Sequence, residues 1–167
     1  PISRASVAVG KTLGSATIAL LQGLIILIFA PLIGVKLTVW TVLALIPLMF
    51  LLAASLGSLG ILLATRIRSM EAFQAVMQML MFPMVFLSGA FFPLQGLPGW
   101  MNVLVKINPA TYGIAPIRQV MLGATSGSAY GISLFGYTLS LWENIAILAA
   151  FGAVMILLAM LSFGSQE

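Results

Sequence analysis

The sequence contains no cysteine, no histidine and no aspartate, and its three acidic residues are all glutamate. Without cysteine, no disulfide framework can form. Without His, Cys or Asp, nearly all metal sites and base-activated nucleophiles lose the side chains they depend on. We therefore expect a protein that is not an enzyme, with no catalytic residue, no metal site and no cofactor bound by this chain.

Charge is also scarce. Only 6% of the residues are charged and 62% are hydrophobic, whereas soluble domains carry about 25% charged residues. The seven Lys and Arg residues are spread along the chain, which disfavours nucleic-acid binding because that requires a basic cluster. Hydrocarbon is the solvent that suits this composition, so the sequence predicts an integral membrane protein.

Long uncharged stretches predict membrane-spanning helices. About 20 apolar residues are needed, because a rise of about 1.5 Å per residue must cross roughly 30 Å of hydrocarbon. The predicted spans cover residues 12–34, 38–65, 72–92 and 143–163. Pro47 and Pro83 lie inside two of them, which membrane helices tolerate. We expect an all-α, polytopic transmembrane helical bundle forming a single domain over residues 1–167.

The region between the third and fourth predicted spans has a different composition. Residues 93–122 contain four prolines yet remain apolar. Pieces this short cannot cross a bilayer, so we expect short interfacial or re-entrant helices. Residues 123–142 are rich in glycine, serine, threonine and tyrosine, which predicts a loop.

The basic residues give an orientation. With a cytoplasmic start, four basic residues lie inside (Arg4, Lys11, Arg66 and Arg68) and three lie outside (Lys36, Lys106 and Arg118). The excess follows the positive-inside rule, with the Arg66/Arg68 pair in a tight loop as its main component.

Two short motifs resemble a phosphate-binding loop and a catalytic serine, but we interpret both as structural. Ala5–Thr12, ASVAVGKT, has Ala5 where a phosphate-binding loop needs glycine, so Lys11 is expected to reach the lipid headgroups. Ser88-Gly89 has no His or buried Lys to activate a serine, and is expected to be a small pair that packs against a neighbouring helix.

Two further features bear on transport. Glu71 and Glu143 each stand at the start of a predicted span, where the helix dipole favours an anion, so neither is expected to relay protons. The methionines clustered over residues 70–84 could line a substrate path or simply pack, and the sequence leaves both readings open.

The stretch Phe73–Gly123 resembles the membrane subunit of type-2 ABC transporters, which export drugs, lipids and polysaccharides. The residues that carry the resemblance are Pro83, Ser88-Gly89, Phe92-Pro93, Leu97-Pro98-Gly99-Trp100, Asn108-Pro109, Tyr112 and Arg118. The flanking residues agree, so the resemblance covers essentially all 167 residues and about the C-terminal two thirds of such a subunit.

The resemblance implies a larger assembly. A full subunit would have six spans, of which this chain would hold the third to sixth. ATP and Mg²⁺ would be bound by a partner ABC ATPase subunit, and a second permease subunit, identical or different, would complete the path. The resemblance also implies a bacterial or archaeal plasma membrane. The apolar path suggests an amphipathic or lipid-like substrate, and lipid-linked glycans stay open as an alternative.

Two groups of site residues follow from the resemblance. The surface facing the ATPase is predicted to contain Ile2, Ser3, Arg4, Lys11, Arg66, Arg68 and Glu71. The outer gate, or re-entrant segment, is predicted to contain Ser88, Gly89, Pro93, Pro98, Trp100, Asn108, Pro109, Tyr112 and Arg118. Arg66 and Arg68 could instead serve only as topology anchors, and the gate segment could be a structural lid.

Two other functions compete with this interpretation. A stand-alone secondary carrier or channel would need intramembrane charge or an internal repeat, and the sequence shows neither. A non-transporting membrane scaffold is compatible with the composition and stays open as an alternative.

Overall fold

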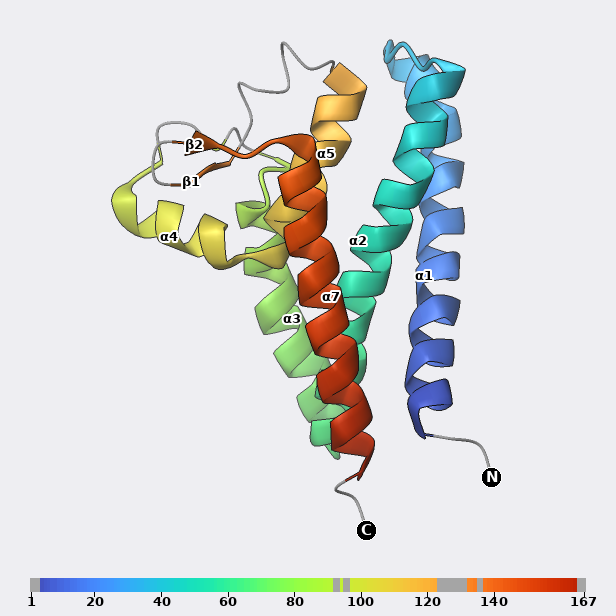
Figure 1. Cartoon of the computed structure of the whole chain (residues 1–167), viewed down its shortest axis with the longest axis vertical. Coiled ribbons are helices and arrows are strands. Elements are labelled where there is room, and N and C mark those ends of the chain that lie inside the picture. The colour runs from blue at the N-terminus through green and yellow to red at the C-terminus, as the bar shows by residue number, and fades with distance from the viewer. Residues whose placement is uncertain (1–3, 92–93, 95–96, 123–131, 135–136, 165–167) are drawn as a thin grey trace.

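The computed structural model describes residues 4–91, 94, 97–122, 132–134 and 137–164. Long helices dominate it (Figure 1). The elements are α1 (Arg4–Phe29), η1 (Ala30–Ile33), α2 (Val39–Arg66), α3 (Met70–Leu87), α4 (Gly99–Ile107), α5 (Pro109–Leu122), β1 (Ser133–Leu134), β2 (Tyr137–Thr138) and α7 (Leu141–Gly164).

Four helices are long and apolar enough to cross a membrane. They cover Ser6–Leu32, Val39–Arg66, Met70–Leu87 and Leu141–Ser162. α1 and α3 run in one direction and α2 and α7 in the other, as successive spans must (Figure 1). The predicted all-α polytopic bundle is confirmed, and the short helices α4 and α5 precede the last span as expected.

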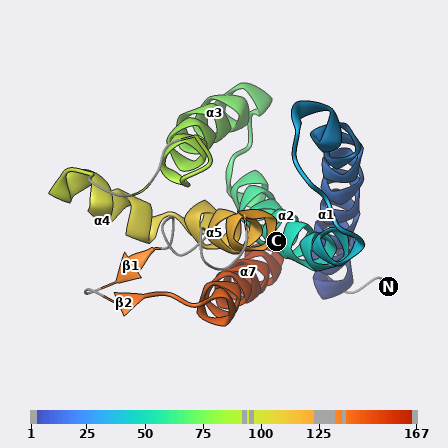
Figure 2. The ribbon, with the colours of Figure 1, turned by 90° about the horizontal axis from the view of Figure 1, so that it is seen from above.

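The centre of the bundle is α2, which packs against α1, α5 and α7 (Figure 2). Its contact with α7 is close because both helices use small residues. The Ser55 hydroxyl donates to the Leu148 carbonyl at 3.1 Å, and a Cβ on Gly152 would lie 2.6 Å from the Ser55 Oγ. Small residues and hydroxyls provide the packing and the interhelical hydrogen bonds on which helix association in lipid depends.

α3 packs loosely against the rest of the bundle. It contacts α5, α4 and α2 over short stretches only, and Figure 2 shows it set apart from α1 and α7. Met79 and Phe82 on its surface are 82% and 68% exposed. The position of α3 therefore depends mainly on contacts near its C-terminal end.

The observed helix ends differ from the predicted ones because local capping overrides hydropathy. α3 ends at Leu87, whereas the predicted span ran to residue 92, because Gly89 adopts a positive φ of 82° directly after the C-cap Ser88. α7 begins at Leu141 rather than residue 143, because the Ser140 and Glu143 side chains bond reciprocally to each other's backbone N–H. This is a capping box.

Two other regions also differ from the prediction. α1 begins at Arg4, before the predicted start at residue 12, since its polar first turns are still compatible with a helix. The predicted loop at 123–142 contains a short antiparallel ladder in which Ser133 pairs with Thr138 and Leu134 with Tyr137. Residues 123–131 of that loop lie outside the described part of the chain.

Candidate functional site

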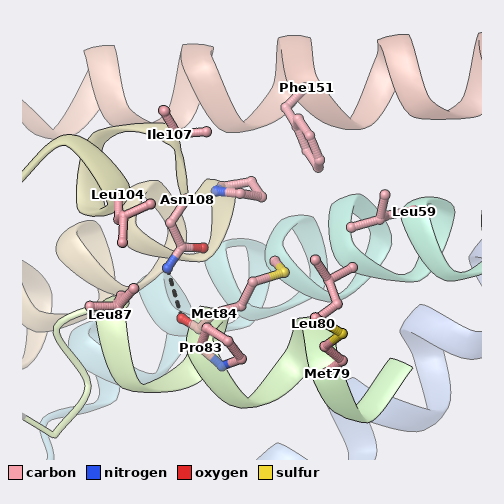
Figure 3. A pocket seen from close by; sticks show the side chains of 11 residues that line it. Leu59, Met79, Leu80, Pro83, Met84, Leu87, Leu104, Ile107, Asn108 and Phe151 are labelled. Carbon is pink, nitrogen blue, oxygen red and sulfur yellow. Dashed lines mark hydrogen bonds between the residues drawn. The ribbon is translucent and has the colours of Figure 1, made fainter. Parts of the chain in front are cut away.

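The C-terminal end of α3 leaves a backbone carbonyl without its helical donor. The Ser88 N–H bonds to the Val85 carbonyl at 3.4 Å, so it does not serve Met84, four residues back. The Met84 carbonyl instead accepts a hydrogen bond from the Asn108 amide Nδ2 at 2.7 Å (Figure 3). A side chain 24 residues away in sequence thus caps α3.

Asn108 also joins the two short helices. Its backbone N–H closes the end of α4 on the Leu104 carbonyl at 3.1 Å. Its side-chain Oδ1 accepts from the Ala110 N–H at 3.0 Å, which is the usual way an asparagine caps a helix N-terminus. Pro109 follows as the first residue of α5, where the missing N–H costs nothing.

Three more side chains of α5 donate to nearby backbone carbonyls. Thr111 Oγ1 donates to Val105 O at 3.0 Å and lies 3.4 Å from Leu87 O. Tyr112 Oη donates to Lys106 O at 2.6 Å. Arg118 Nη2 donates to Ala90 O at 3.0 Å. Three of the accepting carbonyls belong to the ends of α3 and α4, and Ala90 lies in the turn directly after α3. We call Ser88, Gly89, Asn108, Thr111, Tyr112 and Arg118 the α3–α5 junction.

The protonation of Tyr112 suits its role as a donor. Its side chain is buried in a cluster with Ala115, Ile132, Leu139 and Leu148. Burial raises the pKa of the Tyr112 hydroxyl above its ordinary value of 10.0, because an apolar setting disfavours the charged phenolate. The hydroxyl is therefore neutral and able to donate at physiological pH.

A cavity of about 330 Å³ lies beside the junction. Figure 3 shows side chains from α2, α3, α7 and the α4–α5 corner around it. The lining residues are Leu59, Met79, Leu80, Pro83, Met84, Leu87, Leu104, Ile107, Asn108, Pro109 and Phe151. None of them is ionisable, so the cavity can bind apolar material but cannot transfer a proton.

The sequence of this chain is similar to those of known membrane transport proteins. Residues 1–122 match the family described as ABC-2 type transporter. The chain belongs to the ABC-2 type transporter family. Over 160 residues it is 28% identical to a protein of Cyanophora paradoxa named as the transport permease ycf38, covering 93% of this chain and 54% of that protein.

Other relatives share more identity over shorter stretches. Nodulation protein J of Rhizobium meliloti (strain 1021) is 33% identical over 119 residues, which are 71% of this chain and 45% of that protein. Nodulation protein J of Rhizobium leguminosarum bv. viciae is 31% identical over 123 residues, or 73% of this chain and 47% of that protein. The chain spans about half the length of these relatives. No solved structure matches it.

In this ABC-2 family member, most of the predicted gate residues come together. Ser88, Gly89, Asn108, Pro109, Tyr112 and Arg118 lie at or beside the junction. Pro98 and Trp100 do not, because they stand at the other end of α4, about 13 Å away along a nine-residue helix. Trp100 is 65% exposed there. Pro93 lies outside the described residues. Whether this segment gates a path stays a prediction.

The predicted ATPase-facing residues lie at the opposite end of the bundle. The start of α1, the connection between α2 and α3, and the end of α7 all lie at that end (Figure 1). Lys11, Arg68 and Glu71 are exposed. Arg66 is exposed as well, and its Nε donates to the Ser162 hydroxyl at 3.2 Å, which ties α2 to α7. Arg4 begins α1, and Ile2 and Ser3 lie outside the described residues.

Thr111 and Asn144 are among the buried polar residues that sequence reasoning missed. Thr111 is fully buried at the junction, and Asn144 is fully buried in the first turn of α7. Asn144 Nδ2 donates to the Ser140 carbonyl at 2.8 Å, whereas its Oδ1 has no hydrogen-bond partner among the described residues. The spacing Asn-Pro-x-Thr at a helix start could have revealed Thr111. Asn144 could have been noticed as an amide in an otherwise apolar span.

Proposed function

We propose that the chain is part of the permease subunit of an ATP-driven exporter. The observation that carries this proposal is the match of residues 1–122 to the ABC-2 transporter family on four helices able to cross a membrane. In this proposal a separate ATPase subunit binds ATP and Mg²⁺, and two permease subunits enclose the path. The membrane would be the plasma membrane of a bacterium or archaeon.

The distribution of ionisable groups supports an external energy source. Arg66, Glu71 and Glu143 lie in the first or last turn of the helices that carry them, and Lys11 lies two turns from the start of α1. A carrier driven by an ion gradient usually places such groups deep in its spans, where protons or ions must pass. The segment ASVAVGKT is also continuous α-helix here, not the loop that wraps around phosphates. Both features favour nucleotide binding in a partner.

The exposed end containing Arg68 and Glu71 is the proposed contact for the ATPase. Arg68 is the better residue to test than Arg66, because replacing Arg66 would also remove its hydrogen bond to Ser162. The α3–α5 junction at the other end is the proposed outer gate. Because α5 side chains cap both α3 and α4, we expect that gate to move as one unit.

The decisive experiment measures transport in membrane vesicles. The full-length protein is reconstituted with and without the partner ATPase, and uptake of labelled amphipathic drugs and lipids is followed with and without ATP. We expect transport only when both ATPase and ATP are present. Uphill transport by the protein alone would support a stand-alone carrier instead, and no transport of any candidate with a bound, active ATPase would favour the scaffold.

A charge reversal localises the contact. Arg68→Glu should reduce co-purification of the ATPase and coupled transport at least several-fold, because the partner-facing charge changes sign. Lys36→Glu is the matched control, since Lys36 is also exposed but lies between α1 and α2, at the opposite end of the spans. Equal effects of the two variants, or none from Arg68→Glu, would rule out the assigned contact.

A further inference from the structure

The cavity beside the α3–α5 junction lies between helices that are long and apolar enough to cross a membrane. Its walls are the spans α3 and α7, with Leu59 of α2 behind them and the α4–α5 corner covering one end (Figure 3). The lining residues Met79 and Ile107 are 82% and 72% exposed, so they form its rim. The helices that form the walls are long and apolar enough to cross a membrane, where acyl chains are the surrounding medium.

The chemistry of the lining excludes a polar occupant. Every lining side chain is aliphatic, aromatic or a thioether except Asn108. The Asn108 amide already donates to Met84 O and accepts from Ala110 N. A polar ligand would lose its hydration and find few hydrogen bonds in return. A water molecule would also lack the two to four polar partners it needs.

We propose that this groove holds one acyl chain of a bilayer phospholipid. Its volume of about 330 Å³ is at the lower end of the range for small-molecule sites, about 300–1,000 Å³, which suits one chain rather than a whole two-chain lipid. A partner helix, about 10–12 Å across with its side chains, would exceed this volume within a single turn of about 5.4 Å. The flexible thioethers of Met79 and Met84 can adapt to a chain of variable shape.

The affinity of such a site has a specific origin. A chain that leaves the bilayer for the groove moves from one apolar medium to another, so no hydrophobic driving force acts. The stabilisation must come from close packing of the chain against a fixed, well-matched wall. Selection should therefore depend on the chain and hardly on the headgroup. This inference does not depend on the proposed transport function.

Photo-crosslinking tests the proposal. The full-length protein is placed in lipid nanodiscs containing phosphatidylcholine with a diazirine near the end of one acyl chain, irradiated, digested and analysed by mass spectrometry. We expect several-fold more adducts on Leu80, Met84 and Ile107 than on Leu157 and Leu161, which are exposed side chains of α7 outside the groove. The same probe on phosphatidylethanolamine should give the same pattern.

Filling variants provide the control. Leu80→Trp should lower the adducts on Met84 and Ile107 several-fold, and Leu59→Phe, which fills the groove from the opposite wall, should act in the same direction. Leu157→Trp is the matched control and should leave them unchanged. Groove adducts no more frequent than those on Leu161, adducts that survive both filling variants, or crosslinks to a second copy of the chain at the groove would each overturn the proposal.

Discussion

Asn108 stabilises three helix ends at once, which makes it the most sensitive single residue at the junction. Asn108→Ala removes the donor to Met84 O and the N-cap acceptor for Ala110 N. We expect a loss of about 2–4 kcal/mol in the free energy of unfolding, since a helix cap contributes about 1 kcal/mol and a buried carbonyl left unpaired costs about 1–3 kcal/mol. Unfolding of the purified protein in mixed micelles, followed by circular dichroism, measures it.

Two further variants separate the roles of Asn108. Asn108→Ser keeps a hydroxyl that can cap α5 but cannot reach Met84 O, so it should recover only part of the loss. Asn102→Ala makes the same amide deletion on α4, six residues earlier, and should be close to neutral. If Asn108→Ala is as stable as Asn102→Ala, the capping role of Asn108 is wrong.

The Tyr112 hydroxyl gives a pH prediction. Tyr112→Phe removes the hydrogen bond to Lys106 O and should cost about 1 kcal/mol. Burial raises the pKa of Tyr112 in the folded protein, so the contribution of the hydroxyl is fully present below pH 10 and declines only above it, where the unfolded chain ionises first. The difference in unfolding free energy between the two proteins should therefore be constant from pH 6 to 9. A difference that varies within that range would contradict the assigned environment.

Sequence reasoning located most of the junction residues but not the hydrogen bonds that hold them together. Asn108-Pro109 and Tyr112 stood out because an amide, a proline and a phenol are unusual in an apolar segment. Their partners are backbone carbonyls, such as Met84 O, which carry no sequence signal of their own. Thr111 was missed because only its spacing from Asn108-Pro109 marks it in the sequence, and its complete burial is visible only in the folded chain.

The contact between α2 and α7 depends on one position without a side chain. A Cβ on Gly152 would meet Ser55 Oγ at 2.6 Å and Ser55 Cα at 3.2 Å. Because backbone atoms cannot move aside cheaply, we expect Gly152→Ala to destabilise the protein by about 1–3 kcal/mol. Unfolding under the same conditions as for Asn108 measures this effect.

Gly14 supplies the control for the α2–α7 contact. It lies in helix α1, and a Cβ there would have no atom within 4 Å. Gly14→Ala should be neutral or stabilise by up to about 1 kcal/mol, because alanine loses less backbone entropy in a helix than glycine. Equal destabilisation by the two substitutions would show that Gly152 does not act through its contact with Ser55.

Hydropathy predicted the existence of the helices better than their ends. Four runs of apolar residues suffice to predict four spans, because the bilayer imposes length and composition together. The ends depend on local hydrogen bonds instead. Ser88 and Gly89 stop α3 inside an apolar run, and Ser140 starts α7 before its apolar run begins. The ladder between Leu134 and Tyr137 was missed because two-residue strands have no readable period.

The molecule as a whole has one bundle end with Arg66, Arg68 and Glu71, and another with the junction, the β ladder and the start of α2 (Figure 1). Sequence could predict this alternation because each span reverses the direction of the chain. It could not predict that α3 would pack so loosely. Pairing between helices depends on matched small residues such as Ser55 and Gly152, whose partners are not evident from sequence spacing.

The orientation of the bundle in the membrane is open to a direct test, because a chain without cysteine allows one thiol to be placed at a time. Thr38, whose side chain makes no capping bond, and Thr138 are both exposed and lie at the same end of the spans. Met70 is 71% exposed at the other end. The positive-inside rule places the Arg66/Arg68 end in the cytoplasm.

We therefore expect a membrane-impermeant maleimide to label Thr38→Cys and Thr138→Cys in intact cells. Met70→Cys should react only after the membrane is permeabilised, and labelling of all three variants after permeabilisation controls for the accessibility of each thiol. Labelling of Thr38→Cys and Thr138→Cys from opposite sides of the membrane would contradict the four-span arrangement. In that arrangement the chain crosses the membrane twice between the two positions, through α2 and α3. Labelling of Met70→Cys alone in intact cells would agree with four spans but reverse their orientation. The proposed ATPase contact would then lie outside the cell, where no ATPase could bind it.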